Sequence, residues 1–115
     1  MKKDLSEILI EIRKEEEKYF ENYLFYAREI KKIAQERLGK VKVIVFGSIL
    51  RKDEVPRDID VLIISPELKD WETKEKLYSE ILKIIGWQAP FEFHFVTEKE
   101  YEEWYSHFIK EKVEI

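Results

Sequence analysis

Asp58 and Asp60 are two acidic residues, separated by Ile59, at the head of the apolar run Val-Leu-Ile-Ile. Such a run is typical of a buried strand. Side chains two residues apart in a strand point to the same face, with Cα atoms about 6.6–7 Å apart. Two carboxylates so placed can share divalent cations, because magnesium sites typically combine one or two carboxylates with substrate phosphates. The pair therefore predicts a metal site.

The same acidic pair also has a purely structural interpretation. An aspartate buried without a partner in an apolar strand is strongly destabilising, so something must compensate the charge of Asp60. A salt bridge from Arg51 or Arg57 to the acidic pair would do so without any chemistry.

A Gly47-Ser48 turn ends the preceding apolar run, residues 41–46, and Ser48 stands ten residues before Asp58, the first member of the acidic pair. A glycine-serine pair alone is a common turn. A hydroxyl and backbone N–H groups at a helix start are also a common phosphate-binding arrangement. Followed by the acidic pair, the turn predicts a site for a metal-bound nucleoside triphosphate, with Arg51 as the candidate for neutralising phosphate charge.

Glu92 is the third candidate site residue. The segment 91–96 alternates aromatic residues with Glu92 and His94, which predicts a strand with one apolar and one polar face. Adjacent strands lie about 4.8 Å apart, so Glu92 completes a triad with Asp58 and Asp60 if this strand lies beside theirs. Otherwise Glu92 is an ordinary solvated residue. We expect His94 to be a hydrogen-bonded structural residue rather than a metal ligand.

Several other chemistries are excluded by the residue inventory. The three glycines, Gly39, Gly47 and Gly86, cannot form a Walker-type loop or a dinucleotide-binding Gly-x-Gly-x-x-Gly. The chain has no cysteine and no paired-histidine zinc motif. Ser48 lacks the Gly-x-Ser-x-Gly elbow of a serine nucleophile.

Helix and strand signals alternate along the chain. Residues 4–38 have helical periodicity, as one long helix or two in series, because the block 13–18 has no apolar member. The other expected elements are strands at 41–46, 59–64 and 91–96, a short helix at 49–53, a helix from about residue 70 to 85, and a terminal helix begun by a Thr97–Glu100 capping box.

This order predicts an α+β fold, with a small mixed sheet of three or slightly more strands flanked by helices. We expect a single domain over residues 1–115, divided into an N-terminal helical segment at 1–39, a motif-bearing core at 41–96 and a C-terminal helix at 97–115.

Composition narrows the class of protein. The 115 residues carry a net charge of −4, which argues against a domain that binds nucleic acid through its phosphates. No apolar run approaches the roughly 20 residues of a membrane span, and no signal pattern is visible, so we expect a cytoplasmic protein. Abundant Lys and Glu with scarce Asn, Gln and Met indicate a thermophile source.

Gly47-Ser48, Asp58-Ile59-Asp60 and Glu92 together resemble the minimal nucleotidyltransferases (MNT) of the DNA polymerase beta-like superfamily. The resemblance implies that Gly47 and Ser48 hold the triphosphate and that Asp58 and Asp60 bind two Mg²⁺ ions, with Mn²⁺ as a substitute. Glu92 stands where the family has its third carboxylate, usually Asp. The family often has Ser where this chain has Arg57.

The resemblance further implies transfer of a nucleoside monophosphate, AMP from ATP, to an acceptor hydroxyl with release of pyrophosphate. MNT proteins of this size resemble the antitoxins of two-gene modules, in which the partner is a helical HEPN toxin and its tyrosine is adenylylated. RNA or a small molecule could also carry the acceptor hydroxyl. The alternative is a catalytically degenerate scaffold that assembles through its N-terminal helix, with a homo-oligomer as one form of assembly.

Overall fold

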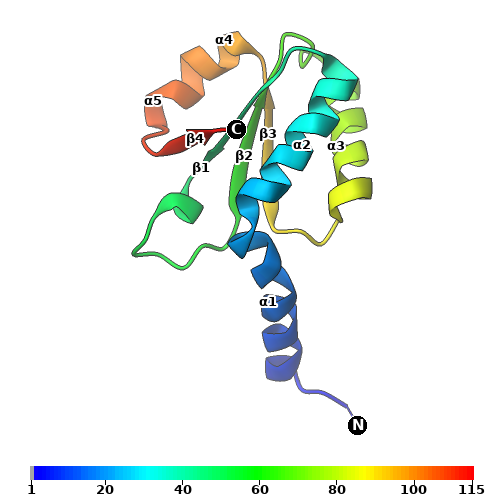
Figure 1. Ribbon diagram of the computed structural model, residues 1–115, viewed down its shortest axis with the longest axis vertical. Coiled ribbons are helices and arrows are strands. Elements are labelled where there is room, and N and C mark those ends of the chain that lie inside the picture. The colour runs from blue at the N-terminus through cyan, green and yellow to red at the C-terminus, as the bar shows by residue number, and fades with distance from the viewer. Residues whose placement is uncertain (1) are drawn as a thin grey trace.

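A four-stranded mixed sheet forms the centre of the protein, with helices on both of its faces (Figure 1). The computed structural model describes residues 2–115. The strands are β1 (Lys42–Phe46), β2 (Ile59–Ile64), β3 (Phe91–Val96) and β4 (Lys112–Glu114), in the order β3-β2-β1-β4. β2 and β3 are parallel, whereas β1 is antiparallel to both of its neighbours. The predicted α+β class and mixed sheet are confirmed.

The N-terminal segment forms two helices in series, α1 (Leu5–Glu21) and α2 (Tyr23–Leu38). The chain leaves helical geometry at Asn22, where φ is −115° and ψ is 30°. α2 packs on the sheet through its buried Ala27, Ile30, Ile33 and Ala34. Tyr19 is the buried residue of α1, which projects away from the sheet in Figure 1.

The two faces of the sheet bury different sets of side chains. Under α2 and α3 (Trp71–Ile85), alternate residues of the three longer strands form the larger core, including Val43, Val45, Val61 and Ile63. The opposite face carries a smaller core, made of Ile44, Phe46, Leu62, Ile64 and Val96. Strand residues alternate in direction, so Asp60, Glu92 and His94 belong to this second face.

The C-terminal helical segment covers the second face. A capping box between Thr97 and Glu100 begins it, as predicted. It then runs through α4 (Glu98–Glu100), the π-helical turn η2 (Tyr101–Tyr105) and α5 (Ser106–Phe108). Tyr101 and Tyr105 pack on the smaller core. π-helical turns are rare and are frequently found at functional sites.

The prediction that residues 97–115 are entirely helical is wrong at the chain end. The helix stops at Phe108, and β4 pairs with β1 through Val45↔Val113. The N–H of Ile115 donates to the carbonyl of Val43 at 2.8 Å. Without β4 the outer edge of β1 would present unpaired backbone N–H and C=O groups. β4 pairs with these groups, whereas a longer C-terminal helix would leave them without partners.

Across residues 2–115, no helix combines the length and apolar character needed to cross a membrane.

Candidate metal and nucleotide site

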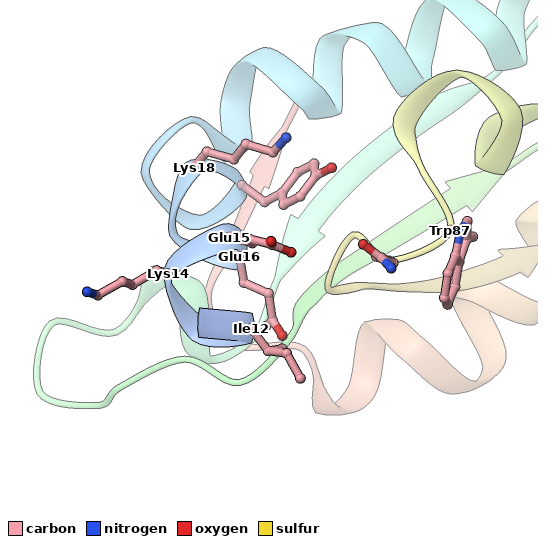
Figure 2. Close-up of a pocket in the computed structure, with 8 residues that line it drawn as sticks. Ile12, Lys14, Glu15, Glu16, Lys18 and Trp87 are labelled. Atoms are coloured by element: carbon pink, nitrogen blue, oxygen red, sulfur yellow. The ribbon is translucent and has the colours of Figure 1, made fainter. Parts of the chain in front are cut away.

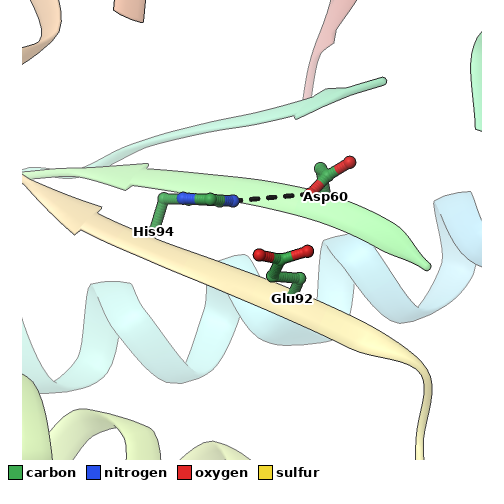
Figure 3. Close-up of side chains that lie close together, drawn as sticks. All are labelled: Asp60, Glu92 and His94. Atoms are coloured by element: carbon green, nitrogen blue, oxygen red, sulfur yellow. Dashed lines mark hydrogen bonds and ion pairs between the residues drawn. The ribbon is translucent and has the colours of Figure 1, made fainter. Parts of the chain in front are cut away.

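Asp60 and Glu92 lie opposite each other on the adjacent parallel strands β2 and β3. His94 follows two residues later on β3, so it shares their face of the sheet. One ligand atom from each of the three residues lies within 4.8 Å of the other two. Figure 3 shows the three side chains directed toward one another above the two strands. The sequence prediction that Glu92 lies beside the acidic motif of β2 is confirmed for Asp60.

Asp60 is stabilised by a histidine, not by an arginine. His94 Nε2 lies 3.4 Å from Asp60 Oδ1, and both side chains are about four-fifths buried, with 23% and 22% of their surface exposed. Among residues 2–115, no salt bridge joins Arg51 or Arg57 to Asp60, so the predicted structural alternative is not the one the fold uses.

His94 is held on several sides. Its Nδ1 lies 3.3 Å from the Tyr105 hydroxyl. The imidazole also contacts the rings of Phe46 and Tyr105, with centroid separations of 5.4 and 5.6 Å. The expected hydrogen-bonded role is therefore confirmed. His94 also brings a third donor atom beside the two carboxylates, which was not predicted from the sequence, although the period-two spacing of His94 from Glu92 was the available signal.

The Tyr105 phenol sits in a partly buried, negatively charged setting. Burial, together with the nearby carboxylates of Glu100 and Glu92, raises the pKa of Tyr105 above its ordinary value. The hydroxyl therefore keeps its proton at neutral pH and remains available to hydrogen-bond the imidazole of His94.

Asp58 lies apart from this cluster. It is exposed and precedes the first residue of β2, Ile59, so the strand does not fix its direction. The three-residue group that could hold an ion contains Asp60, Glu92 and His94 but not Asp58. A metal-binding role for Asp58 stays a prediction.

Gly47 brings the glycine-serine turn against Asp60. β1 ends at Phe46, which is the register partner of Asp60, and Gly47 follows with φ of +90°. A Cβ at Gly47 would collide with Asp60 Oδ2. This position therefore needs glycine for two reasons, the left-handed backbone and the close approach of the carboxylate.

Ser48 opens the 3₁₀ turn η1 (Ser48–Leu50), which replaces the short helix predicted at 49–53. The half-buried Ser48 thus directly follows the residue that touches Asp60. The structure places the predicted phosphate-binding turn beside the predicted metal ligand, although binding by Gly47 and Ser48 stays a prediction.

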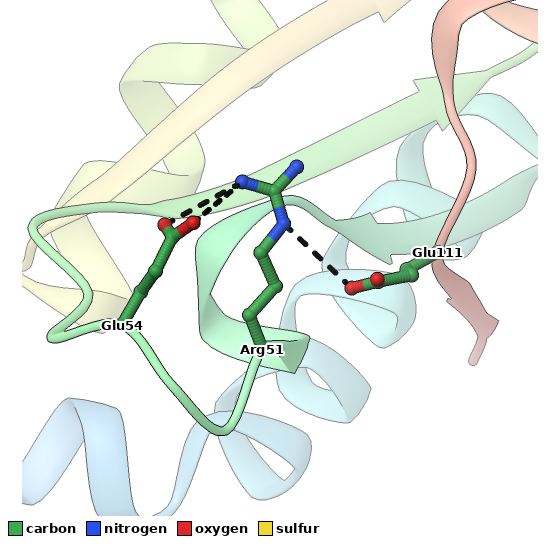
Figure 4. A network of polar contacts seen from close by, with 3 residues as sticks. All are labelled: Arg51, Glu54 and Glu111. Carbon is green, nitrogen blue, oxygen red and sulfur yellow. Dashed lines mark hydrogen bonds and ion pairs between the residues drawn. The ribbon is translucent and has the colours of Figure 1, made fainter.

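Arg51 is engaged elsewhere on the surface. Its guanidinium lies 3.2 Å from Glu54 and 3.8 Å from Glu111, and the Arg51 side chain is 46% exposed (Figure 4). Exposed ion pairs of this kind are weak, typically about 0–1 kcal/mol. Arg51 can therefore exchange these partners for a phosphate at little cost, and its predicted role is neither confirmed nor contradicted.

A separate cleft of about 670 Å³ lies between α1 and the loop after α3. Ile12 and Glu16 line one side of it and Trp87 the other (Figure 2), and Tyr19 and Gln88 are also among its lining residues. Asp60, Glu92 and His94 are not among its lining residues, so this cleft is distinct from the metal cluster.

The donor set fits a divalent cation. Carboxylate oxygens suit magnesium and manganese, and an imidazole nitrogen extends the range to other transition metals. The Asp60 and Glu92 carboxylates are fixed by strands rather than by loops, which favours a defined geometry.

Comparison with known proteins agrees with this geometry. A model of the nucleotidyltransferase domain family matches residues 27–115. A crystal structure of a candidate nucleotidyltransferase is 30% identical to this chain, with a TM-score of 0.65, and the match covers 76% of this chain and 95% of that one. No curated protein matches the sequence significantly.

A second crystal structure, of a candidate nucleotidyltransferase from Sulfolobus solfataricus, is 22% identical, with a TM-score of 0.59. That match covers 84% of this chain and 82% of the other, and at this identity it shows the shared fold. The range matched by the family model contains the Gly47-Ser48 turn, Asp60 and Glu92, whereas α1 lies outside it. The chain belongs to the nucleotidyltransferase domain family.

Proposed function

We propose that this protein is a Mg²⁺-dependent nucleotidyltransferase that moves AMP from ATP to an acceptor hydroxyl. The observation that carries the proposal is the pairing of Asp60 with Glu92 across β2 and β3, directly beside the Gly47 turn. The family match supports transferase chemistry, and the two facing carboxylates supply the oxygen ligands that Mg²⁺ prefers.

In this proposal each site residue has a defined task. Asp58, Asp60 and Glu92 hold the divalent cations, and Gly47 and Ser48 bind the triphosphate through backbone N–H groups and the hydroxyl. Arg51 leaves Glu54 and Glu111 to balance phosphate charge. Bound cations would stabilise the attacking and leaving oxygens of an in-line displacement.

The bond changes are those of nucleotidyl transfer. The acceptor oxygen forms a bond to the α-phosphorus while the bond from that phosphorus to the pyrophosphate oxygen breaks. The acceptor hydroxyl must lose its proton, and the Glu92 carboxylate is the group placed to accept it. Glu92 is exposed on β3, which allows an acceptor to approach it from solvent.

We further propose that the acceptor is a tyrosine of a helical HEPN-type partner, with this chain as the MNT antitoxin of the pair. The exposed apolar residues of α1 support this assignment, because such a surface can contact a protein partner. A protein partner would then supply the acceptor hydroxyl itself.

The transfer is tested with ATP labelled at the α-phosphate or at the γ-phosphate. The proposal predicts that the α-label, with Mg²⁺, becomes covalently attached to a co-purified acceptor, while the γ-label does not. The Asp60→Asn variant should attach neither. Mass spectrometry should find adenylate units on a tyrosine of the partner. Attachment of the γ-label, or full activity of Asp60→Asn, would contradict the proposal.

One observation favours a second candidate, a scaffold that assembles through α1. Leu5, Ile8, Leu9 and Ile12 repeat at the spacing of one helix face, and their exposed fractions range from 42% to 71%. Contiguous exposed apolar surface of this kind marks interaction sites. A scaffold would bind no triphosphate with Mg²⁺ and would keep its assembly when Asp60 and Glu92 are replaced, whereas the enzyme would bind triphosphate and lose that binding in the same variants.

A further inference from the structure

The metal cluster differs in one respect from a pair of carboxylates. Its third donor is an imidazole nitrogen of His94, within 4.8 Å of ligand atoms on Asp60 and Glu92, and Nε2 is the nitrogen that lies 3.4 Å from Asp60 Oδ1. Magnesium prefers sites made wholly of oxygen, whereas imidazole suits zinc, iron, nickel and copper. A site with two oxygen ligands and one nitrogen ligand therefore favours these transition metals over Mg²⁺ more strongly than two carboxylates alone would.

The second observation is the contact on the other side of the imidazole. Tyr105 Oη lies 3.3 Å from His94 Nδ1, on the nitrogen that does not face the carboxylates. Metal-ligating histidines almost always hydrogen-bond through their second ring nitrogen, which fixes the orientation and tautomer of the ring. The Phe46 ring contacts the same imidazole at a centroid separation of 5.4 Å, so His94 is held by an aromatic contact and at its far nitrogen.

We propose that His94 is a metal ligand and that Asp60, Glu92 and His94 form a mixed site for a first-row transition-metal dication, which it binds in preference to Mg²⁺. Tyr105 is the positioning residue of this site. The inference rests on the proposed function, since it concerns the same site and names the cation that the site takes.

The distances are compatible with closure around one ion. Ligand atoms about 2.0–2.2 Å from a metal are at most roughly 4.4 Å apart. The three donor atoms already lie within 4.8 Å of one another. Small side-chain rotations of Asp60 and Glu92 would therefore bring the three donor atoms to bonding distance from one ion. The backbone need not move, because the pairing of β2 with β3 holds it in place.

The hydrogen bonds also predict a change in the histidine tautomer. An ionised Asp60 can only accept, so the neutral ring places its proton on Nε2 and accepts the Tyr105 hydroxyl at Nδ1. As a ligand, Nε2 must offer its lone pair instead. The proton then sits on Nδ1 and donates to Tyr105 Oη, which can accept because a hydroxyl serves both roles.

The test measures Co²⁺ and Mg²⁺ binding to the whole chain without nucleotide. The native chain should bind Co²⁺ more tightly than Mg²⁺ by at least about tenfold, as the ligand preferences require. His94→Gln should remove most of this preference by lowering Co²⁺ affinity while changing Mg²⁺ affinity little. Tyr105→Phe should lower Co²⁺ affinity roughly 10–100-fold, the usual cost of losing an outer hydrogen-bond partner. His107→Gln, an exposed histidine on α5, is the matched control and should behave as the native chain.

A spectroscopic signature separates ligation from a structural effect. The Co²⁺-loaded native chain should show a strongly shifted, exchangeable imidazole N–H proton resonance from Nδ1, absent in His94→Gln and broadened in Tyr105→Phe. A ratio of Co²⁺ to Mg²⁺ affinity that His94→Gln leaves unchanged would overturn the inference, as would the absence of this resonance at saturating Co²⁺.

ATP binding measured separately distinguishes this failure from failure of the proposed function. If ATP binds with Mg²⁺ but the chain shows no His94-dependent preference for Co²⁺ over Mg²⁺, the inference fails and the nucleotidyltransferase proposal stands. If the His94-dependent preference is present and ATP does not bind with any cation, the inference about the metal stands and the proposed function fails.

Discussion

Asp60 on β2 and Glu92 on β3 are direct register partners across two parallel strands. Backbone pairing therefore sets the distance between their carboxylates, because adjacent strands are held about 4.8 Å apart. The site depends on the sheet rather than on loops, and substitutions at these two positions should affect binding far more than folding.

Asp60→Asn and Glu92→Gln should each lower the affinity for a divalent cation. The loss should exceed the roughly 10–100-fold that removal of an outer-shell partner costs. Both carboxylates are at least partly accessible, so the melting temperature should change little. Titration with Mn²⁺, followed by the relaxation of water protons, measures the affinity, and native-like affinity in either variant would refute the assigned ligands.

Asp58→Asn should behave differently. Asp58 is exposed and lies outside the three-residue cluster, so cation affinity without nucleotide should be almost unchanged. Nucleotidyl transfer should nevertheless fall, because the proposed mechanism uses Asp58 once the triphosphate is bound. Paired measurements of metal binding and label transfer check this, and a variant with full transfer would remove Asp58 from the site.

Gly47→Ala should disable the site, whereas Gly39→Ala should not. Both glycines have positive φ, +90° and +79°, in backbone regions that other residues rarely adopt, so both variants should lose stability, by about 1–3 kcal/mol. A Cβ at Gly47 would additionally collide with the Asp60 carboxylate, but one at Gly39 meets nothing within 4 Å. Urea unfolding gives the stability cost and cation titration the binding. Equal cation affinity in the two variants would show that Gly47 does not shape the site.

Thr97→Ala should destabilise the helical segment that covers His94. The Thr97 hydroxyl accepts from the Glu100 N–H, and the Thr97 N–H donates to Glu100 Oε1. Loss of such a cap typically costs about 1 kcal/mol. Ser79→Ala, an exposed substitution within α3, should stay within about 0.5 kcal/mol of the native chain. Denaturant unfolding measures the free energy of unfolding of both variants. An equal free energy of unfolding in the two variants would mean that the cap does not stabilise the protein.

The exposed face of α1 should mediate any assembly of the chain. Ile8 lies on the face shared by Leu5, Leu9 and Ile12, whereas Ile10 points to the opposite side of the helix. Ile8→Glu should therefore disrupt concentration-dependent association, and Ile10→Glu should preserve it. Sedimentation velocity over a range of concentrations measures both. Association that survives Ile8→Glu unchanged would exclude this face of α1.

The sequence predicted the parts of the site that follow from strand periodicity. The alternation of residue types placed Glu92 on the other face of its strand from Phe91 and Phe93. The apolar run after Asp60 identified β2. The register that pairs Asp60 with Glu92 is a feature of the folded sheet, because two adjacent strands can pair in more than one register. The turn at Gly47 was predicted from residue type, although the close approach to Asp60 that requires glycine is a tertiary contact.

What the sequence could not predict depends on contacts between distant segments. The second ring nitrogen of His94 contacts Tyr105, eleven residues later in the chain, and no local pattern indicates that contact. Arg51 is held by Glu111 from the end of the chain, a contact that no local pattern indicates. β4 is a three-residue strand, too short for a periodicity signal, and it forms because the free edge of β1 accepts it.

The most direct test of the nucleotidyltransferase assignment is calorimetric titration of ATP into the native chain and into Asp60→Asn, with Mg²⁺, with Mn²⁺ and with neither. We expect ATP binding by the native chain to require a divalent cation and to be lost in Asp60→Asn. Absence of ATP binding by the native chain with either cation, or equal binding by the two proteins, would contradict it.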